Sequence, residues 1–487
     1  MKSIIKKLKN YKPPKYICYL YFFIPIIVSC ITNVAKEEDI WFLLNHGKYL
    51  VHHGFPTIEP FTIHTNFAFV MQQWLSALIF YISNFLLGKY GLILVIVLVN
   101  LLILYFLYKL CMLLSNNKYT ISTIVTCVTD VILLLFILPR PQIFTLLFLV
   151  IVLYIMELFY KNKNTKAIYF LILISLLQIN FHAAMWPMIY LFMLPYLVNY
   201  IILYFKKKDK RLFKLLSIIV IMLLVQFINP YGIESIKYVF NSYGNKYINR
   251  IVYEMRATTF EIFQGQIFFT TLLILITIYI FYRKNKMQLR HFLLFIGVVV
   301  LALSNFRNVM LYVVGTIPFL AYYLKDLITD SKKTKIKDKL YKNKYIITIL
   351  FLVIISILSM IFISPSFNNK LKLDKGVNYL LKNNKKEDIV LYTGYDNGSY
   401  PEYRGIKAYM DTRAEVFLKS NNKKEDVFKE YYYLTYGLLD YDSFLEKYKF
   451  THLLISKKER LYYIISVNKS YKKIFNTKKY SIFEKID

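Results

Sequence analysis

The sequence predicts an all-α polytopic membrane bundle of about 11 transmembrane helices, followed by a C-terminal extracytoplasmic α/β domain. Three observations lead to this fold class. Of the 487 residues, 57% are apolar and 18% aromatic, whereas only 19% are charged. The formal net charge is nevertheless +33, and this combination excludes both a disordered chain and an ordinary soluble enzyme. Long apolar runs fill the chain up to residue 364, and the composition then changes to alternating charges.

Twelve apolar runs in the sequence are candidates for membrane-spanning helices. A helix needs roughly 17–25 residues to cross the hydrocarbon core, and most of the runs reach this length. The first run has no small-residue cleavage site, so we expect a helix there rather than a signal peptide. The runs are 16–35, 67–87, 91–114, 119–138, 142–160, 167–182, 184–205, 213–229, 262–282, 290–305, 307–327 and 345–364.

The distribution of basic residues decides how many runs cross the membrane. With twelve crossings and a cytoplasmic N-terminus, the loops 161–166, 205–211, 283–290 and 325–344 would lie outside, although they hold 20 Lys and Arg residues. This arrangement violates the positive-inside rule. Omitting the polar run 67–87 returns all four loops to the cytoplasm. We therefore expect 67–87 to be an interfacial helix on the outer face, which leaves eleven spans and an outer C-terminus.

This topology divides the chain into two predicted domains. Residues 1–364 form the transmembrane domain, whose first outer loop is 36–90, and residues 365–487 form the soluble domain. The polar segments of varied chemistry all face outward, so one aqueous face collects the candidate site residues. In the soluble domain, alternation and turn signals predict strands at 388–392, 406–410, 450–456, 461–466 and 480–484 and helices at 374–383 and 424–437.

The first outer loop begins with an acidic run that includes Glu38 and Asp39. Apolar residues then recur with a helical period up to residue 51, so Asp39, His46 and His53, spaced by seven, share one helix face. An acid beside two imidazoles is suited to a general base or a cation ligand. Alternatively, Asp39 only caps the helix. Glu59 follows between two prolines, either as a second carboxylate or as a solvated loop acid.

Two arginines lie at outer helix ends in a chain whose 62 basic residues include only ten arginines. Arg140 stands between two prolines and Arg307 precedes an asparagine. A planar guanidinium there is suited to bidentate contact with a phosphate, although an interfacial anchor is the alternative. His182, at a third outer helix end, is either a site residue or a hydrogen-bonded packing residue. Glu254 and Arg256 lie in the outer loop 229–261 and are further candidates.

The order of motifs along almost the whole chain resembles a large bacterial family of polytopic membrane proteins that are similar to GT-C glycosyltransferases. GT-C is the fold class of the protein O-mannosyltransferases and the oligosaccharyltransferases. The sequence departs from the family pattern at Glu59, Gln73 and Ala183, and the change at Gln73 removes a carboxylate. The matching residues are Asp39-Ile40-Trp41, Gly54 with Pro56 to Thr62, Gln73-Trp74-Leu75, Arg140-Pro141-Gln142, Asn180 with His182, Asn229-Pro230-Tyr231-Gly232, Phe306-Arg307-Asn308, and Asp396, Gly398, Tyr400, Asp411 and Arg413.

The resemblance implies an inverting glycosyltransferase of the bacterial cytoplasmic membrane that transfers a sugar from a polyprenyl-phosphate donor to an outer glycan, lipid or protein. A non-catalytic scaffold for envelope assembly and a lipid or solute transporter are the alternatives. A nucleic-acid partner is excluded, because the charge lies in cytoplasmic loops as topology requires. The expected site residues are Asp39 as the general base; Arg140, Arg307 and His182 at the donor phosphate; Glu38, Glu59 and His53 at a divalent cation (Mg²⁺ or Mn²⁺) or the acceptor; and Asp396, Tyr400, Asp411 and Arg413, the last two as an internal salt bridge or a sugar-binding pair.

Overall fold

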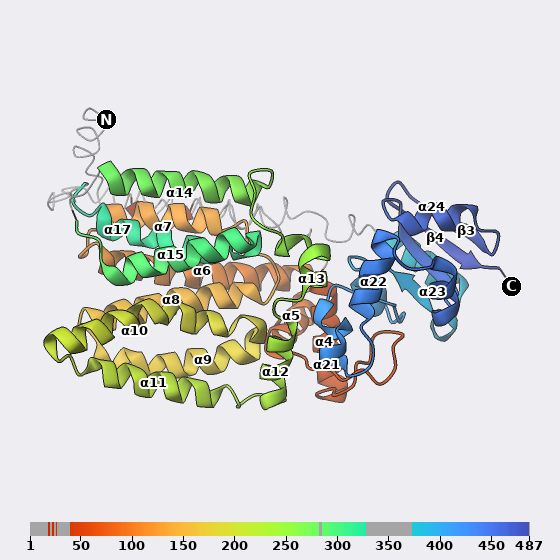
Figure 1. Cartoon of the computed structure of the whole chain (residues 1–487), viewed down its shortest axis with the longest axis horizontal. Coiled ribbons are helices and arrows are strands. Elements are labelled where there is room, and N and C mark those ends of the chain that lie inside the picture. Colours follow the sequence, from red (N-terminus) through yellow and green to blue (C-terminus); the bar gives the residue numbers. More distant parts are fainter. Residues whose placement is uncertain are drawn as a thin grey trace. The chain divides into compact units, whose positions relative to one another are not determined.

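The computed structural model describes residues 39–281, 285–327 and 373–486, together with five residues between Cys18 and Ile26. The expected spans 16–35 and 345–364 and the acid Glu38 therefore lie outside the described residues, apart from those five. The chain divides into two compact units, each with its own packing (Figure 1). Unit 1 contains the described parts of Tyr90–Ile228 and Glu254–Pro365. Unit 2 contains those of Ala35–Lys89, Asn229–Tyr253 and Ser366–Asp487.

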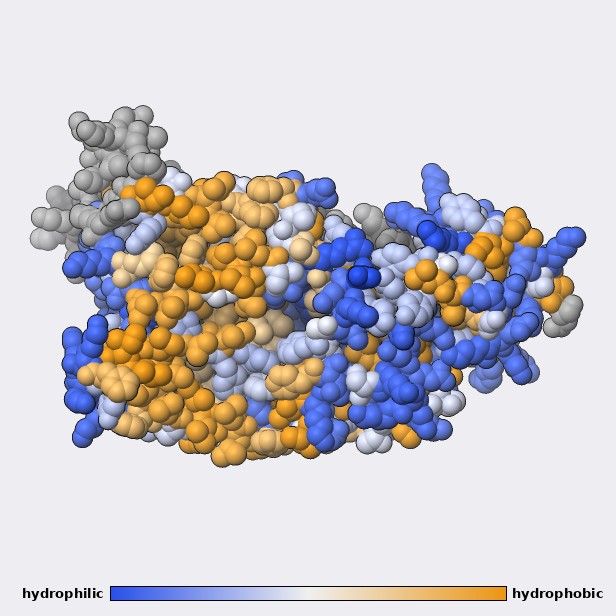
Figure 2. Space-filling view, viewed as in Figure 1, coloured by the Kyte–Doolittle hydropathy of each residue, from blue (hydrophilic) through white to orange (hydrophobic). Residues whose placement is uncertain are grey.

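Unit 1 is helical, and Figure 2 shows apolar side chains gathered over its helices. Among the described residues, four helices are long and apolar enough to cross a membrane, namely Lys89–Leu114, Gln142–Tyr160, Ala183–Lys207 and Phe263–Ile280. The elements are α6 Lys89–Leu114, α7 Tyr119–Leu133, α8 Gln142–Tyr160, η1 Thr165–Tyr169, α9 Phe170–Phe181, η2 Ala183–Met185, α10 Pro187–Lys207, α11 Arg211–Val225, α14 Phe263–Phe281, α15 Leu289–Ser304, η4 Phe306–Asn308, α16 Val309–Thr316, η5 Ile317–Phe319 and α17 Leu320–Tyr323.

The turns between these helices use residues that tolerate the left-handed backbone conformation. Asn116 and Asn117 follow α6 with φ of 57° and 65°, Asn162 follows α8 with φ of 54°, and Lys208 ends α10 with φ of 55°. A residue in this conformation turns the chain out of the helix and satisfies its last carbonyl groups. Local turn chemistry therefore ends the apolar runs where the sequence predicts, and it returns the chain into the bundle.

A buried carboxylate joins three helices of unit 1. Glu157 of α8 accepts hydrogen bonds from Arg290 Nε at 2.7 Å and Nη2 at 3.0 Å on α15, and from the Tyr196 hydroxyl of α10 at 3.0 Å. His291 of α15 contacts the same carboxylate at 3.0 Å. Charges inside an apolar bundle are costly unless they are paired. Arg290, counted above among the loop charges, is 2% exposed and serves this internal pair.

Unit 2 combines helices with a small sheet. The strand order is β1-β2-β4-β3, in which β1 and β2 are parallel and the other neighbours antiparallel. The elements are α4 Ile40–His53, α5 Trp74–Leu87, α12 Ile233–Ser242, α13 Lys246–Ile251, α19 Asp374–Asn383, η6 Lys386–Asp388, β1 Leu391–Thr393, α20 Ser399–Tyr403, η7 Ala414–Phe417, α21 Lys419–Asn422, α22 Val427–Tyr436, α23 Tyr441–Tyr448, β2 His452–Ser456, α24 Arg460–Val467, β3 Tyr471–Asn476 and β4 Tyr480–Lys485.

Two strands expected in the C-terminal segment are wrong. Residues 461–466 form α24, in which Leu461 and Ile465, four residues apart, are buried while Tyr463 is 66% exposed. That spacing is helical rather than alternating. In 406–410 only isolated bridges form, at Ala408. The strand β3 was not expected, since its exposed lysines hide the alternation of a strand.

The run 67–87 is helical only from Trp74, as α5. The preceding residues are extended, and Phe69 N donates to Thr57 O at 2.9 Å. At 1.5 Å per residue, the 14 residues of α5 measure roughly 21 Å, less than the ~30 Å hydrocarbon core. This length favours an interfacial helix over a span. The topology itself stays a prediction.

The first outer loop packs with the C-terminal segment rather than apart from it. Ile63 N donates to Ala408 O, and Ala68 N donates to Asn422 O, both at 3.0 Å. Helix α4 contacts α20, and the middle loop joins the same body through α12 on α21 and α13 on α22. Unit 2 thus assembles three chain segments that the sequence assigned to two domains. Backbone pairing between distant loops leaves no periodic signal in the sequence.

Candidate functional site

Arg140 lies in the short turn between α7 and α8. Its backbone N donates to Leu138 O at 2.7 Å, and Pro141 then takes the N-cap position of α8. Proline suits this place, because the first turn of a helix has no acceptor for its N–H. Gln142 fixes the turn by donating to Phe136 O at 2.8 Å. The Pro-Arg-Pro-Gln string therefore places the Arg140 side chain at a helix end.

Arg307 lies in η4, between α15 and α16. The Asn305 side chain accepts from Asn308 N at 3.2 Å, and Phe306 N donates to Arg256 O at 3.1 Å. The loop that carries Arg256 is thereby held against the same helix end. Within the described parts of the chain, the buried Arg307 Nε has no hydrogen-bond partner. A half-buried guanidinium with an unused donor is suited to an anionic ligand.

Glu254 pairs with Arg140 and also feels the charge of Arg307. Its carboxylate lies 2.6 Å from Arg140 Nη1, and the two side chains are 31% and 17% exposed. Burial alone would raise the pKa of Glu254, but the Arg140 and Arg307 guanidinium groups lower it. The carboxylate is therefore ionised at neutral pH. Two arginines and one carboxylate leave a net charge of about +1, which attracts an anion.

His182 lies beside this cluster, directly after α9. Its Nδ1 contacts Thr145 Oγ1 of α8 at 2.9 Å, and Gln178 donates both to Thr145 Oγ1 at 3.0 Å and to His182 O at 2.9 Å. Arg307 acts on the ring electrostatically. With 3% exposure, His182 has the geometry of a hydrogen-bonded packing residue next to Arg307. Thr145 and Gln178 carried no sequence signal, since both lie inside apolar runs.

Asp39 occupies the N-cap position of α4 in unit 2. Its side chain forms no capping hydrogen bond with the described first turn of that helix, so the capping alternative is not supported. Asp39 instead acts on Tyr395, whose pKa is raised by burial and then by the charges of Asp39, Glu415 and Asp396. The Tyr395 hydroxyl donates to Thr412 O at 2.8 Å. The charge of Asp39 therefore acts on a buried residue of the C-terminal segment.

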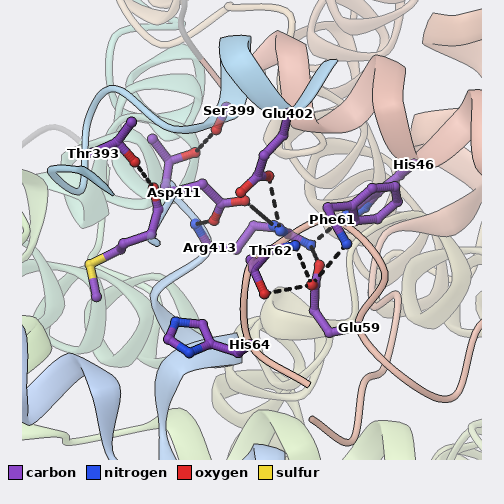
Figure 3. Close-up of polar contacts among 12 residues, drawn as sticks. His46, Glu59, Phe61, Thr62, His64, Thr393, Ser399, Glu402, Asp411 and Arg413 are labelled. Atoms are coloured by element: carbon purple, nitrogen blue, oxygen red, sulfur yellow. Dashed lines mark hydrogen bonds and ion pairs between the residues drawn. The ribbon is translucent and has the colours of Figure 1, made fainter. Parts of the chain in front are cut away.

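Arg413 is the centre of a buried charge network in unit 2 (Figure 3). Its guanidinium lies 2.9 Å from Glu59, 2.5 Å from Asp411 and 3.2 Å from Glu402, and all four side chains are at most 1% exposed. Nη1 also contacts His46 Nε2 at 3.1 Å. Asp411 and Arg413 were expected to form either an internal salt bridge or a sugar-binding pair. The structure shows the internal salt bridge. The N–H groups of the Arg413 guanidinium bind internal partners, so few of them are available to a sugar.

The protonation states in this network follow from its burial. Desolvation and the Asp411 charge raise the pKa of Glu402 well above its usual range, so Glu402 is protonated. Desolvation and the Arg413 charge lower the pKa of His46, so the ring is neutral. Glu59 Oε2 accepts from Thr62 N at 2.8 Å and from Thr62 Oγ1 at 2.9 Å. Glu402 was not predicted, because nothing in its sequence context signals burial.

The other expected site residues of unit 2 do not converge. His53 is exposed and stacks on Tyr49 at 4.5 Å, whereas Glu59 is buried beside Arg413. Tyr400 donates to Asp374 at 2.6 Å, and Asp396 is exposed in the turn before α20. Among the described residues, no group of three His, Cys, Asp or Glu side chains could hold a metal ion. Among the described residues, Glu59 and His53 therefore do not form part of a common cation site.

Comparison with solved structures identifies the class of fold, a GT-C-like membrane fold. The chain is similar to the crystal structure of ArnT from Cupriavidus metallidurans in the apo state, with a TM-score of 0.50, 10% identity, and 96% of this chain and 97% of that chain covered. A second ArnT structure, bound to undecaprenyl phosphate, gives a TM-score of 0.44 at the same identity and coverage. ArnT is a GT-C glycosyltransferase. No protein-family model and no curated protein sequence matches the chain.

Proposed function

We propose that this protein is a membrane glycosyltransferase that transfers a sugar from a polyprenyl-phosphate donor to an extracytoplasmic acceptor. The observation that carries the proposal is the ion pair of Arg140 with Glu254, a carboxylate on which the charge of Arg307 also acts, in a GT-C-like bundle. A non-catalytic scaffold does not require arginines, which are scarce in this chain, to lie close together at this place. The proposed topology keeps the N-terminus in the cytoplasm and places this cluster on the outer face.

The charge of the cluster suits both the donor and its leaving group. A polyprenyl-phosphate sugar is a phosphodiester with one negative charge, which balances the net +1 of Arg140, Arg307 and Glu254. When the bond from the anomeric carbon to the phosphate oxygen breaks, the electron pair stays on the phosphate and adds a second negative charge. Preorganised arginines stabilise such developing charge. Arg140 is proposed to share its fork between Glu254 and the phosphate.

Unit 1 also offers space for part of an isoprenoid chain. A cavity of about 150 Å³ lies between α14, α15 and α16 and is lined mainly by apolar side chains, among them Leu275, Phe295 and Phe319. The lining includes His291, and α15 runs from there to Ser304, three residues before Arg307. Those 13 residues measure roughly 20 Å. A chain with its phosphate at Arg307 and its tail along α15 would reach the cavity.

Asp39 is the proposed general base. It takes the proton of the acceptor hydroxyl, the hydroxyl oxygen bonds to the anomeric carbon, and the polyprenyl phosphate leaves from the opposite face, which inverts the configuration. The place of Asp39 supports this role, because its carboxylate belongs to the loop that the GT-C resemblance assigns to the essential acid, directly before α4. The acceptor is a glycan, lipid or protein on the outer face.

The proposal is tested with the purified full-length protein and a panel of radiolabelled polyprenyl-phosphate sugars. Transfer to a membrane extract, or slow donor hydrolysis, is expected from the wild type and not from Arg307→Gln. Absence of both from the wild type with every donor contradicts the enzyme. Equal activity in the two proteins contradicts the assignment of the phosphate site. The Arg211→Lys variant is the matched control, because Arg211 pairs with Asp209 at 2.7 Å in a loop distant in sequence from the cluster.

A further inference from the structure

The positive charge of the C-terminal segment is concentrated at its end. Residues 373–456 contain 13 basic and 13 acidic residues, whereas residues 457–486 contain nine basic and only two acidic residues. One of those two acids, Glu459, is half-buried and accepts hydrogen bonds from Ser456 N and Tyr392. The last 30 described residues therefore carry an excess of about seven positive charges, and the preceding 84 carry none.

Five of these charges, those of Lys469, Lys472, Lys473, Lys478 and Lys479, lie on the edge strand β3 or in the segments at its two ends. Strand β3 is the last strand of the order β1-β2-β4-β3, and α24 packs against it. The basic edge, as we name this surface, consists of residues on α24, β3, β4 and the turns beside them. Eight of its nine basic side chains are exposed, namely Lys458, Arg460, Lys469, Lys472, Lys473, Lys478, Lys479 and Lys485.

Three ordinary causes of a lysine excess do not explain the basic edge. A coding bias toward lysine acts equally on residues 373–456, where acids balance the bases. The positive-inside rule concerns short loops next to spans, not a folded sheet. Lysines on an edge strand prevent pairing with other strands, but that purpose needs only Lys472 and Lys473 of β3. The lysines in the turns, such as Lys478 and Lys479, need another reason.

The side chains of the basic edge are suited to a sugar-containing anion. Lys473 Nζ lies over the rings of Tyr462 and Phe483 at 5.3 and 5.4 Å, which holds one ammonium group in place. Tyr463 is 66% exposed on α24 and offers an aromatic face among the cations. An aromatic ring next to positive charge favours a ligand that has both an apolar sugar face and an anionic group.

Within unit 2, the basic edge is separate from helices α4 and α5. Helix α5 ends at Leu87, and Gly88 connects it directly to α6, which is long and apolar enough to span the bilayer. The exposed Phe85 and Leu86 extend the apolar surface of that junction. Within unit 2, the sheet and α24 lie at the end opposite α4 and α5 (Figure 1). The apolar surface of α5 and the basic edge are therefore separate surfaces of unit 2.

We infer that the basic edge binds a soluble anionic glycan polymer, one whose repeating units carry phosphate or carboxylate groups, and that this polymer is the acceptor. The role of this polymer as the acceptor rests on the proposed function, whereas its binding to the basic edge does not. A polyanion releases counterions when it meets clustered lysines, so affinity must fall steeply with salt. A polymer contacts many lysines at once, and this suits a surface whose charges are spread over a strand, its turns and a helix.

The test is a direct binding measurement with the full-length protein in neutral detergent. Long-chain inorganic polyphosphate is the probe, and dextran is its uncharged counterpart. The variant Lys472→Gln/Lys478→Gln/Lys479→Gln removes three charges of the basic edge. The matched control, Lys382→Gln/Lys385→Gln/Lys419→Gln, removes three exposed charges from the balanced part of the same segment. We expect salt-dependent binding of polyphosphate, about tenfold or more weaker in the first variant and within about twofold of wild type in the control.

Three outcomes overturn the inference. Absence of polyphosphate binding removes the site, and equal weakening in both variants shows a general charge effect. Binding to phosphatidylglycerol vesicles in preference to polyphosphate assigns the edge to a lipid surface. A measurement of donor hydrolysis distinguishes failure of the binding inference from failure of the proposed function. The rate of donor hydrolysis should be the same in the first variant as in the wild type. Polyphosphate binding without donor turnover contradicts only the enzyme.

Discussion

The Arg140 guanidinium lies 2.6 Å from the Glu254 carboxylate, although the two residues are 114 positions apart. One follows α7 and the other lies in the loop before α14, so the pair joins two helix ends of unit 1. The carboxylate orients the Arg140 guanidinium through a hydrogen bond and partly neutralises its positive charge. Arg307 acts on the same carboxylate. An anion that enters this cluster meets cations whose positions are already fixed.

Arg140→Lys is expected to reduce kcat/KM for the donor by about tenfold or more. The ammonium keeps the charge but loses the planar fork that binds Glu254 and a phosphate oxygen together. Tenfold corresponds to about 1.4 kcal/mol of transition-state stabilisation. Steady-state kinetics with a radiolabelled donor measures the change, and Arg211→Lys should leave it within about twofold. A wild-type value in Arg140→Lys would show that charge alone suffices.

Arg307→Gln is expected to abolish transfer while leaving the protein as stable as the wild type. The Arg307 Nε has no hydrogen-bond partner in the described part of the chain, so its loss breaks little internal structure. A group that binds only the ligand changes activity without changing the melting temperature. Thermal unfolding in detergent and donor turnover are measured on the same preparation. A fall of about 4 °C or more would instead assign Arg307 to packing.

Asp39→Asn is expected to lower kcat by roughly 10²–10⁴ with little change in KM for the donor, as removal of a general base does. Because asparagine keeps the size and the capping ability of aspartate, the melting temperature should stay within about 2 °C of the wild type. The capping alternative predicts retained activity in Asp39→Asn, because asparagine caps a helix as well as aspartate does, and about 1 kcal/mol of lost stability only in Asp39→Ala. Measuring turnover and melting together separates the two.

Apolar runs and turn residues made the helices of unit 1 predictable, because both signals are local. The run 142–160 coincides with α8, and 119–138 with α7 except for its last turn. The pairs between distant residues were not predictable. Nothing near Glu157 indicates Arg290, 133 positions later, and nothing near Glu59 indicates Arg413. Such pairs form only after the fold brings their elements together.

The candidate site shows the same division. Arg140 and Arg307 were found because arginine is scarce in this chain and because both follow breaks in apolar runs. Their shared partner, Glu254, was only one of several loop acids. Two further residues expected at a cation or the acceptor do not converge, since Glu59 is buried on Arg413 and His53 is exposed. Residue type and position predicted the candidates, but burial and pairing decided among them.

Arg413→Met is expected to destabilise unit 2 strongly. Removal of the guanidinium leaves the ionised carboxylates of Glu59 and Asp411 buried without their partner, which typically costs about 3–5 kcal/mol. The variant Arg413→Met/Glu59→Gln should recover part of the loss, because it removes one of the unpaired charges. Thermal unfolding of the full chain in detergent measures both. Equal melting of Arg413→Met and wild type would show that Arg413 only spans the network without stabilising it.

His64 should make unit 2 sensitive to acid. Burial lowers its pKa from 6.5 to about 4, against smaller opposing effects from the Tyr409 carbonyl, Glu425 and Glu430. The ring Nε2 lies 2.8 Å from Tyr409 O and is therefore the donor. Because the folded protein holds this ring neutral, its contribution to stability is complete above pH 6.5. It is lost as the pH falls from 6.5 to about 4, by about 3 kcal/mol in all.

His64→Gln tests this window, since a glutamine amide keeps a donor near Tyr409 O but does not titrate. Melting temperatures of the full chain are measured from pH 7.5 to pH 4. The wild type should lose stability below pH 6.5, and the variant should lose less. The remaining slope belongs to the other histidines whose pKa is lowered by burial, among them His46 and His452. Parallel curves for the two proteins would show that His64 is already protonated in the folded state or solvated within it.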